Sequence, residues 1–306
     1  MALSPSPSLL VVGTLALDSI ETPEIRAKEV LGGSASYFAM AASLLGPVRL
    51  VGVVGEDFPV AHRELLASRP IDLGGLVSAK GGKTFRWSGR YHADMNTRDT
   101  LDTELNVIAG FRPVLPDGFR DSPFVYLAND SPSTQISTLE QARARRFVML
   151  DTMNYWIEHE KAALFDVLNR VDGVIINDEE ARLLTGEKNL ISAGTRVLEL
   201  GPRVVVVKKG EHGAFLFSHF VRHALPAYPI EDVVDPTGAG DSFAGGFMGF
   251  LARRGTVSLA NLKRAMAYGT VLASFAVEAV SLERLATLTR EEVETRLDDF
   301  LQFMSP

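Results

Sequence analysis

The sequence of 306 residues contains no cysteine, which excludes disulfides, thiolate metal sites and cysteine nucleophiles. It also lacks an excess of positive charge, because 31 Lys and Arg residues stand against 38 Asp and Glu residues, for a formal net charge of -7. We therefore expect no nucleic-acid partner and no attraction to anionic membranes. Any anion that the protein binds must be held by a local site.

Long apolar runs are absent as well. No run reaches the roughly 18 residues needed to cross a bilayer, and residues 1–7 carry no basic signal-like segment. We expect a cytoplasmic protein with a short disordered N-terminus. The 46% hydrophobic content is that of a globular protein, and no linker or internal repeat divides the chain. The sequence therefore predicts a single domain over residues 1–306.

Short apolar runs alternate with amphipathic stretches along most of the chain. Uninterrupted apolar strands of this kind suit a parallel sheet that is covered on both faces. Strands are predicted at 9–12, 48–54, 124–127, 147–150, 173–176, 204–207 and 214–218. Helices are predicted at 34–45, 60–67, 133–145, 160–170, 178–184, 191–200, 239–253 and 261–277. The alternation predicts an α/β fold with a doubly wound, mainly parallel sheet flanked by helices.

One region departs from this alternation of strands and helices. Residues 83–111 begin with alternating aromatic and polar side chains, which predict antiparallel strands with one wet face. We interpret the region as a small β-lid that excludes water from a reaction site. An ordinary surface hairpin and a dimer contact are the alternatives.

The most informative segment runs from Asp235 to Phe247 and contains the motif Asp-Pro-Thr-Gly-Ala-Gly-Asp. Its proline and glycines predict a turn that leads into a helix, so free N–H groups of Gly238, Ala239 and Gly240 are expected to face an anion. A carboxylate repels phosphate, and Asp241 is therefore better suited to take a proton from an attacking hydroxyl. The alternative is that the glycines serve helix packing and that Asp241 caps the helix.

The whole segment, with Ser-Phe-Ala-Gly-Gly after Asp241, resembles the C-terminal signature of the ribokinase-like (PfkB) carbohydrate kinases. This resemblance implies an anion hole built by the glycine loop and a catalytic base at Asp241. It also implies a lid over the acceptor site, made from about 14–31 and 83–111, and allows a homodimer formed through that lid.

Acceptor-binding residues follow from the same resemblance. The pair Gly32-Gly33 before a helix is similar to the family's first signature, where glycines admit acceptor hydroxyls close to the backbone. The family often has Asn where this chain has Tyr37, so sugar specificity does not transfer. Asp18 fits the family's acceptor-binding acid, although a turn residue is the alternative, and Asn129 lies at a predicted strand end, where open α/β sheets bind ligands.

Nucleotide-binding residues are predicted further along the chain. Asn177 and Glu180 resemble the family's Asn-x-x-Glu motif, which implies that Glu180 holds Mg²⁺ through water. The same spacing also predicts a helix capping box. Lys208, Gly210 and Gly213 resemble the family's loop beside the triphosphate, with a hairpin turn as the alternative, and Ser274 would line the adenine pocket. Residues 278–281 lack the glycine that accompanies a monovalent-cation site in relatives, which makes potassium activation doubtful.

Together these features predict an ATP- and Mg²⁺-dependent kinase that phosphorylates a hydroxyl of a sugar or sugar derivative. Arginines at 86, 90 and 98 suit an acidic sugar, whereas Trp87 and Tyr91 suit stacking on a sugar or a base. A nucleoside kinase is the first alternative. A ligand-binding regulator without catalysis is the alternative of another class.

Overall fold

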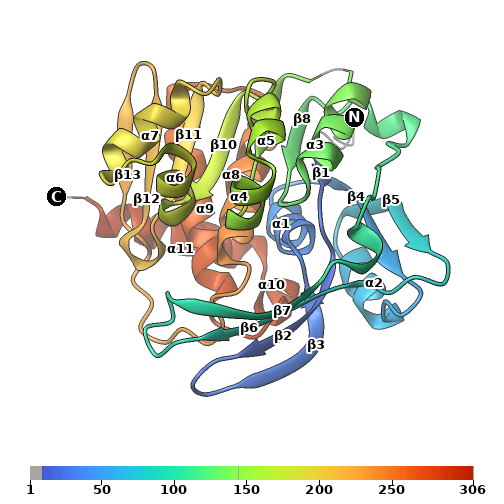
Figure 1. The fold of residues 1–306 in the computed structure, drawn as a ribbon. Helices are drawn as coiled ribbons and strands as arrows, with labels where there is room; N and C mark the ends of the chain where they lie inside the picture. The colour runs from blue at the N-terminus through green and yellow to red at the C-terminus, as the bar shows by residue number, and fades with distance from the viewer. Residues whose placement is uncertain (1–8, 144, 306) are drawn as a thin grey trace, which may run out of the picture.

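A computed structural model describes residues 9–143 and 145–305. Its central sheet is covered by helices on both faces, and a smaller sheet lies beneath the helices at one end of the molecule (Figure 1). This arrangement confirms the predicted α/β fold with a mainly parallel sheet. The segment 1–7, for which disorder is predicted, lies outside the described residues. No helix in the described part of the chain has the length and apolar character needed to span a membrane.

The central sheet has nine strands among the described residues. They are β1 (Leu9–Val12), β4 (Val48–Gly55), β5 (Ile71–Ala79), β8 (Phe124–Leu127), β9 (Phe147–Leu150), β10 (Gly173–Asn177), β11 (Val204–Lys208), β12 (Ala214–Ser218) and β13 (Arg222–Leu225). Their order is β13-β12-β11-β10-β9-β8-β1-β4-β5, and only the pairs β11–β12 and β12–β13 are antiparallel. The strand order thus reverses between β1 and β8, which is the point where such sheets open a crevice.

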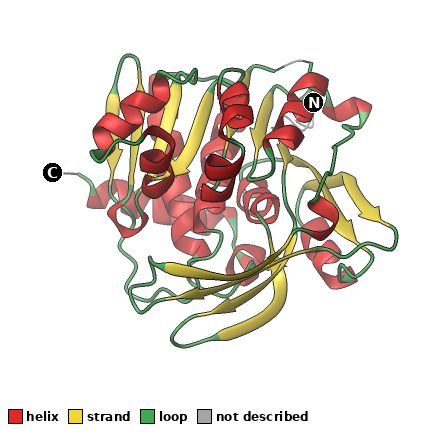
Figure 2. Ribbon diagram, viewed as in Figure 1, coloured by secondary structure: helices red, strands yellow, loops and turns green. Residues whose placement is uncertain are grey.

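Helices form the two outer layers (Figure 2). One face is covered by α1 (Ser34–Ser43), α2 (Val60–Ala67), α8 (Ala239–Arg254), α9 (Leu259–Ala276), α10 (Glu283–Thr287) and α11 (Arg290–Phe303). The other is covered by α3 (Pro132–Gln141), α4 (Asn154–His159), α5 (Lys161–Leu168), α6 (Asp178–Thr185) and α7 (Leu190–Leu198). Short 3₁₀ turns are η1 (Asn106–Ile108), η2 (Asp117–Phe119) and η3 (Gly210–His212). Alternate residues of β1 enter the two cores, as the period of a strand requires.

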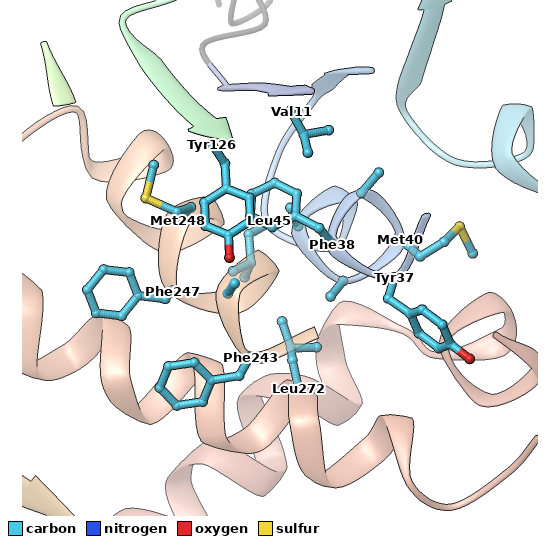
Figure 3. Close-up of a cluster of buried hydrophobic side chains, with 14 of the residues drawn as sticks. Val11, Tyr37, Phe38, Met40, Leu45, Tyr126, Phe243, Phe247, Met248 and Leu272 are labelled. Atoms are coloured by element: carbon cyan, nitrogen blue, oxygen red, sulfur yellow. The ribbon is translucent and has the colours of Figure 1, made fainter. Parts of the chain in front are cut away.

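The core on the first face joins segments from both ends of the chain. Figure 3 shows Phe38 of α1 beside Tyr126 of β8, and their rings stack with centroids 4.3 Å apart. Helix α8 approaches α1 closely because Gly245 has no side chain, since a Cβ there would lie 2.5 Å from the carbonyl oxygen of Phe38. Arg69, after α2, donates to the carbonyl oxygens of Leu285, Ala286 and Leu288 at 2.7 to 2.8 Å.

The small sheet has four strands, in the order β3-β2-β6-β7, within the described residues. They are β2 (Ala16–Glu21), β3 (Arg26–Gly32), β6 (Phe85–Tyr91) and β7 (Arg98–Glu104). Strands β2 and β6 pair in parallel, which joins the two segments 14–31 and 83–111, and the second segment ends in η1 rather than in further strand. Strand β7 is exposed along its whole length. Strand β7 is therefore wet on both faces of the sheet, whereas the alternating sequence pattern predicts one wet face.

Candidate active site

The predicted site residues gather at the carboxyl ends of the parallel strands and at the small sheet that faces them. At the reversal point, a Cβ on Gly13 after β1 would lie 2.6 Å from the Cβ of Ala128 after β8, so the two strand ends are in close contact. The hydroxyls of Thr14 and Ser34 lie 3.0 Å apart, and both donate to the carbonyl oxygen of Asn129. This network fixes the start of α1 at the crevice.

Gly33 and Gly32 have different steric reasons to be glycine. Gly33, the N-cap of α1, has φ +91, and a Cβ there would lie 2.5 Å from the carbonyl oxygen of Thr14. A Cβ on Gly32 would lie 1.8 Å from Asp18 Oδ2. The double glycine therefore makes room for the turn and for the Asp18 carboxylate.

Asp18 lies on β2 and is buried, with 4% of its surface exposed. Its Oδ1 has no hydrogen-bond partner among the described residues. The pKa of Asp18 is raised to about 8, first by burial and then by the nearby carboxylates of Asp235 and Asp241, while the hydrogen bond from the N–H of Gly33 acts in the opposite direction. An unpartnered carboxyl oxygen in this position can accept a hydrogen bond from a ligand hydroxyl.

Asn129 lies at the predicted strand end, but its side chain is already bonded. Its Nδ2 donates to Met153 Sδ at 3.1 Å, and its Oδ1 accepts from Trp156 Nε1 at 3.1 Å. Both partners belong to the segment after β9, which the sequence pattern does not connect to Asn129. The amide therefore has protein partners at both of its ends.

The loop before α8 is a turn held by Asp235. Its Oδ1 accepts from the N–H of Thr237, and its Oδ2 accepts from the N–H of Ser281, both at 2.9 Å. Gly238 has φ +74 and lies against the ring of Tyr37, since a Cβ on Gly238 would lie 2.3 Å from two ring atoms. Tyr37 is fully buried, and no described residue accepts from or donates to its hydroxyl.

The N–H groups of this loop are arranged almost as the sequence predicts. Those of Gly238 and Gly240 find no acceptor among the described residues. The N–H of Ala239, which we expected to be free, donates to the carbonyl oxygen of Pro236 at 3.3 Å and closes the turn. The N–H groups of Gly238 and Gly240 thus remain open at the N-terminus of α8, where the helix dipole favours an anion.

Asp241 lies in the first turn of α8, next to these donors. The pKa of Asp241 is raised to about 7, first by burial and then by the charge of Asp151, while the positive charges of Lys208 and Arg98 act in the opposite direction. A carboxylate with a pKa near neutrality is well matched to accept a proton at physiological pH.

Asn177 and Glu180 form the capping box that their spacing predicts. Asn177 Oδ1 accepts from the N–H of Glu180 at 2.7 Å, and Glu180 Oε2 accepts from the N–H of Asn177 at 2.8 Å. Glu180 is nevertheless buried, and its pKa is raised to about 8, first by burial and then by Asp151. The remaining oxygen, Oε1, has no hydrogen bond within the described part of the chain.

Lys208 ends β11 and lies between the capping box and the loop. A Cβ on Gly240 would lie 2.7 Å from Lys208 Nζ, so the ammonium group is packed against the loop. Burial works against its charge, but the carboxylates of Asp151, Glu180 and Asp241 overcome this and raise the pKa of Lys208. Asp151, directly after β9, was not predicted, although the rule that ligands bind at strand ends would have indicated it.

The small sheet contacts the turn 210–213 at one place and the loop before α8 at another. Asn96, in the turn between β6 and β7, donates to Glu211 at 3.1 Å. A Cβ on Gly210 would lie 2.6 Å from Oδ1 of Asn96. Thr237 lies in the loop before α8 and donates to the hydroxyl of Tyr91 at 3.2 Å. Residues 235–240, which are that loop and the start of the helix, are called the anion loop. Gly213 has φ +81 and lies against β13, because a Cβ there would be 2.1 Å from the carbonyl oxygen of Leu225. The small sheet is therefore closed over the site.

Among the described residues, Ser274 has no hydrogen bond to another predicted site residue. It is buried in α9, its hydroxyl donates to the carbonyl oxygen of Val271, and it accepts from Arg296 of α11. The hydroxyl thus serves helix packing.

Comparison with known proteins adds to this geometry. Residues 7–286 match the model described as pfkB family carbohydrate kinase. The chain is 31% identical over 250 residues to a cytidine kinase from Thermococcus kodakarensis, covering 80% of this chain and 88% of that protein. It is 29% identical over 307 residues to a nucleoside kinase from Methanothermobacter thermautotrophicus, covering 90% and 91%.

Solved structures show the same fold. A putative ribokinase II from E. coli in complex with ATP and Mg²⁺ superimposes with a TM-score of 0.78 at 20% identity, covering 96% of this chain and 99% of the other. An adenosine kinase from Sinorhizobium meliloti superimposes with a TM-score of 0.79 at 19% identity, covering 94% and 100%.

Proposed function

Because the chain belongs to the pfkB family of carbohydrate kinases, which transfer a phosphoryl group to a hydroxyl acceptor, we propose that it uses ATP to phosphorylate a nucleoside. One arrangement carries the proposal. Asp241, with a pKa of about 7, lies in the first turn of α8 beside two N–H donors without acceptors and beside the Lys208 ammonium. A base, an anion hole and a positive charge are the groups that phosphoryl transfer needs.

In the proposed reaction, the acceptor hydroxyl lies between Asp18 and Asp241. Asp241 accepts the hydroxyl proton while the acceptor oxygen bonds to the γ-phosphorus of ATP, and the bond from that phosphorus to the β–γ bridging oxygen breaks to release ADP. The N–H groups of Gly238 and Gly240, with Ala239 shaping the turn, stabilise the transferring oxygens. Lys208 neutralises charge on the same group.

The residues present fit Mg²⁺ and ATP. Oε1 of Glu180 is left over from the capping box, and an oxygen in that position suits a water molecule of the hydrated ion. When bound, Mg²⁺ would neutralise phosphate charge. The turn with Gly210 and Gly213 would lie beside the triphosphate. Since both Asp235 oxygens already accept backbone N–H groups, we propose that the enzyme works without a monovalent cation.

Two observations favour a nucleoside over the simple sugar that the sequence pattern suggests. The two relatives named above are a cytidine kinase and a nucleoside kinase. In addition, Asp18 and Trp87 are paired in register on β2 and β6, so their side chains share one face of the small sheet. A carboxyl for a sugar hydroxyl and an indole for a base would then lie side by side. Asn129 holds Trp156 in this proposal instead of contacting the acceptor.

The test is acceptor-dependent ADP release from Mg-ATP, with nucleosides, ribose, sugar acids and sugar phosphates as acceptors. Asp241→Asn is the control. Turnover with cytidine or another nucleoside that disappears in the control supports the proposal, and turnover with free sugars alone would replace the nucleoside by a sugar. ATP binding without turnover on any acceptor would favour a ligand-binding regulator.

We also propose that the enzyme acts in the cytoplasm, where ATP is supplied, without nucleic-acid or membrane partners. A homodimer through the small sheet remains a prediction. The fully exposed edge strand β7 supports it, since an open edge can pair with another strand. Analytical ultracentrifugation of the free and nucleotide-bound protein would test it.

A further inference from the structure

One buried carboxylate near the anion loop has no part in the mechanism above. Asp151 is 5% exposed and directly follows β9, at the same edge of the sheet as Lys208. Its Oδ1 accepts from the N–H of Thr152 at 2.8 Å, and its Oδ2 lies 3.7 Å from Lys208 Nζ. The second distance describes an ion pair that is too long for a hydrogen bond. A buried carboxylate requires such a partner.

Lys208 is held on two sides as a result. Its side chain is only 17% exposed, Asp151 attracts the ammonium from one side, and Gly240 leaves the space that it occupies on the other. A lysine stem is flexible, so an ammonium without an anchor would sample several positions. Among the described residues, Asp151 is the one carboxylate within ion-pair distance of the Lys208 ammonium.

A second ion pair, between the residues that directly precede β10 and β11, gives a contrast. Asp172 accepts from the N–H of Val148, near the start of β9, and pairs with Arg203 at 2.6 Å. Arg203 is 60% exposed and lies at the opposite end of the parallel strands from the anion loop. This pair joins neighbouring strands. It faces solvent, whereas Lys208 faces the anion loop.

We infer that Asp151 is a positioning residue for phosphoryl transfer, whose carboxylate holds the Lys208 ammonium against Gly240 so that it meets the transferring phosphoryl group. This inference rests on the proposed function and deepens it. Asp151 itself touches neither the phosphoryl group nor the acceptor. Asp151 also raises the pKa of Asp241, so the comparison is made at a pH well above that pKa, where Asp241 is ionised in every variant. There the effect of Asp151 passes through Lys208, and removing both residues should be no worse than removing Lys208 alone.

The experiment compares Asp151→Asn, Lys208→Met, the double variant and Asp172→Asn in the full-length protein. We expect kcat to fall about 10²–10³-fold in Lys208→Met, as for loss of one preorganised electrostatic group. In Asp151→Asn the displaced ammonium should lower kcat about 10- to 100-fold. The double variant should match Lys208→Met, KM for the acceptor should stay constant, and Asp172→Asn should keep wild-type kcat.

A role confined to folding would give a different pattern. Losses that multiply in the double variant, or wild-type kcat in Asp151→Asn, would overturn the inference. If Asp151→Asn does not fold, Gly240→Ala tests the same placement, since its methyl group would displace Lys208 Nζ. Gly240→Ala must then lower kcat in the wild type and have little further effect in Lys208→Met.

Binding of Mg-AMP-PNP, measured by calorimetry, separates this inference from the proposed function. Both Asp151→Asn and Lys208→Met should weaken the affinity by about tenfold or more, as for one charged contact, whether or not an acceptor is known. Unchanged affinity in Asp151→Asn, with weakened affinity in Lys208→Met, contradicts the positioning role. An inactive Asp241→Asn beside a fully active Asp151→Asn would leave the proposed function standing and remove only this inference.

Discussion

The two sheets of this protein differ in almost every physical respect. Strands β1, β8 and β9 of the central sheet are buried at every position, whereas β7 of the small sheet is exposed at every position. The central sheet is held by two apolar cores, and the small sheet carries ion pairs such as Arg86–Asp57 at 2.8 Å and Arg90–Glu21 at 2.8 Å. Exposed pairs of this kind contribute little stability.

Under the proposed function, this difference separates the residues for phosphoryl transfer from the residues that recognise the acceptor. Asp241, Glu180 and Lys208 come from elements that the apolar cores hold in place. Asp18, Trp87 and Tyr91 come from the small sheet. Apart from Leu17 and Leu31, which belong to the first core, side chains on the small sheet can change without disturbing the apolar cores. A new acceptor can therefore be recognised while the phosphoryl-transfer groups keep their geometry.

The largest effect on kcat should come from a substitution among the proposed phosphoryl-transfer residues. Asp241→Asn keeps the shape of the side chain but removes the base, so we expect kcat to fall about 10²–10⁴-fold. Affinity for Mg-AMP-PNP should be retained, because the variant removes a negative charge beside the phosphate. Steady-state kinetics and calorimetry measure the two quantities. Near-normal turnover would remove Asp241 from the role of base.

The free energy of unfolding should also respond very differently to a substitution in the core beside the central sheet and to one on the small sheet. Phe247 of α8 is fully buried, and Phe247→Ala should lower the free energy of unfolding by about 3–5 kcal/mol. Leu101 of β7 is 47% exposed, and Leu101→Ala should change it by less than about 0.5 kcal/mol. Urea unfolding followed by circular dichroism measures both. A comparable loss in Leu101→Ala would show that the small sheet belongs to the cooperative core.

The pH dependence of kcat should report the ionisation of Asp241. Its pKa of about 7 means that the carboxyl is protonated below pH 7 and unable to accept the hydroxyl proton. We expect kcat to fall about tenfold per pH unit below that value and to level off above it. Bound Mg-ATP changes the surrounding charge, so the profile of kcat/KM for the first substrate is the one to compare with the free protein. A profile without an acidic limb near neutrality contradicts this assignment.

Asp18→Asn should give the smallest change, and it should affect recognition. We expect KM for the acceptor to rise about tenfold, because an amide replaces the buried carboxyl that meets the acceptor hydroxyl, with a smaller effect on KM for ATP. Acceptor titrations at saturating ATP measure it. A fall in kcat as large as that of Asp241→Asn would mean that the small sheet takes part in the chemistry.

The same variant should alter stability in a pH-dependent way. The pKa of Asp18 is about 8 in the folded protein and about 3.9 in an unfolded chain, so the folded state holds a proton that the unfolded state loses. Stability contributed by this group is complete below pH 4 and declines as the pH rises toward 8. Asp18→Asn should therefore raise the Tm at pH 8.5 relative to the wild type, by about 2 °C or more, and have little effect at pH 4.

Much of the central fold could be predicted because buried parallel strands are continuous apolar runs. The predicted strands 9–12, 124–127 and 147–150 coincide with β1, β8 and β9. Strand β5 was missed because its Ile-Asp-Leu-Gly-Gly start mixes polar and small residues at an edge of the sheet. Helix α11 was also missed, although the spacing of buried Val293, Leu297 and Phe300 is helical.

In the candidate site, local motifs could be predicted and long-range contacts could not. The spacing of Asn177 and Glu180 predicts their capping box, since both partners belong to one helical turn. Asn96 and Glu211 are 115 residues apart, and only the folded chain brings them together. The partners of Asn129 and the pairing of Asp151 with Lys208 have the same origin. Nothing in the local sequence indicates which strand ends become neighbours.

The contacts between the two ends of the chain have a consequence for protein synthesis. Arg69 emerges from the ribosome long before the carbonyl groups of Leu285 and Leu288, which follow 216 and 219 residues later. Helix α1 similarly has to wait for α8, its partner in the first core. A nascent chain thus exposes apolar surface until its last third is made, and the large sequence separation slows folding. Productive expression should depend on chaperones that shield this surface during translation.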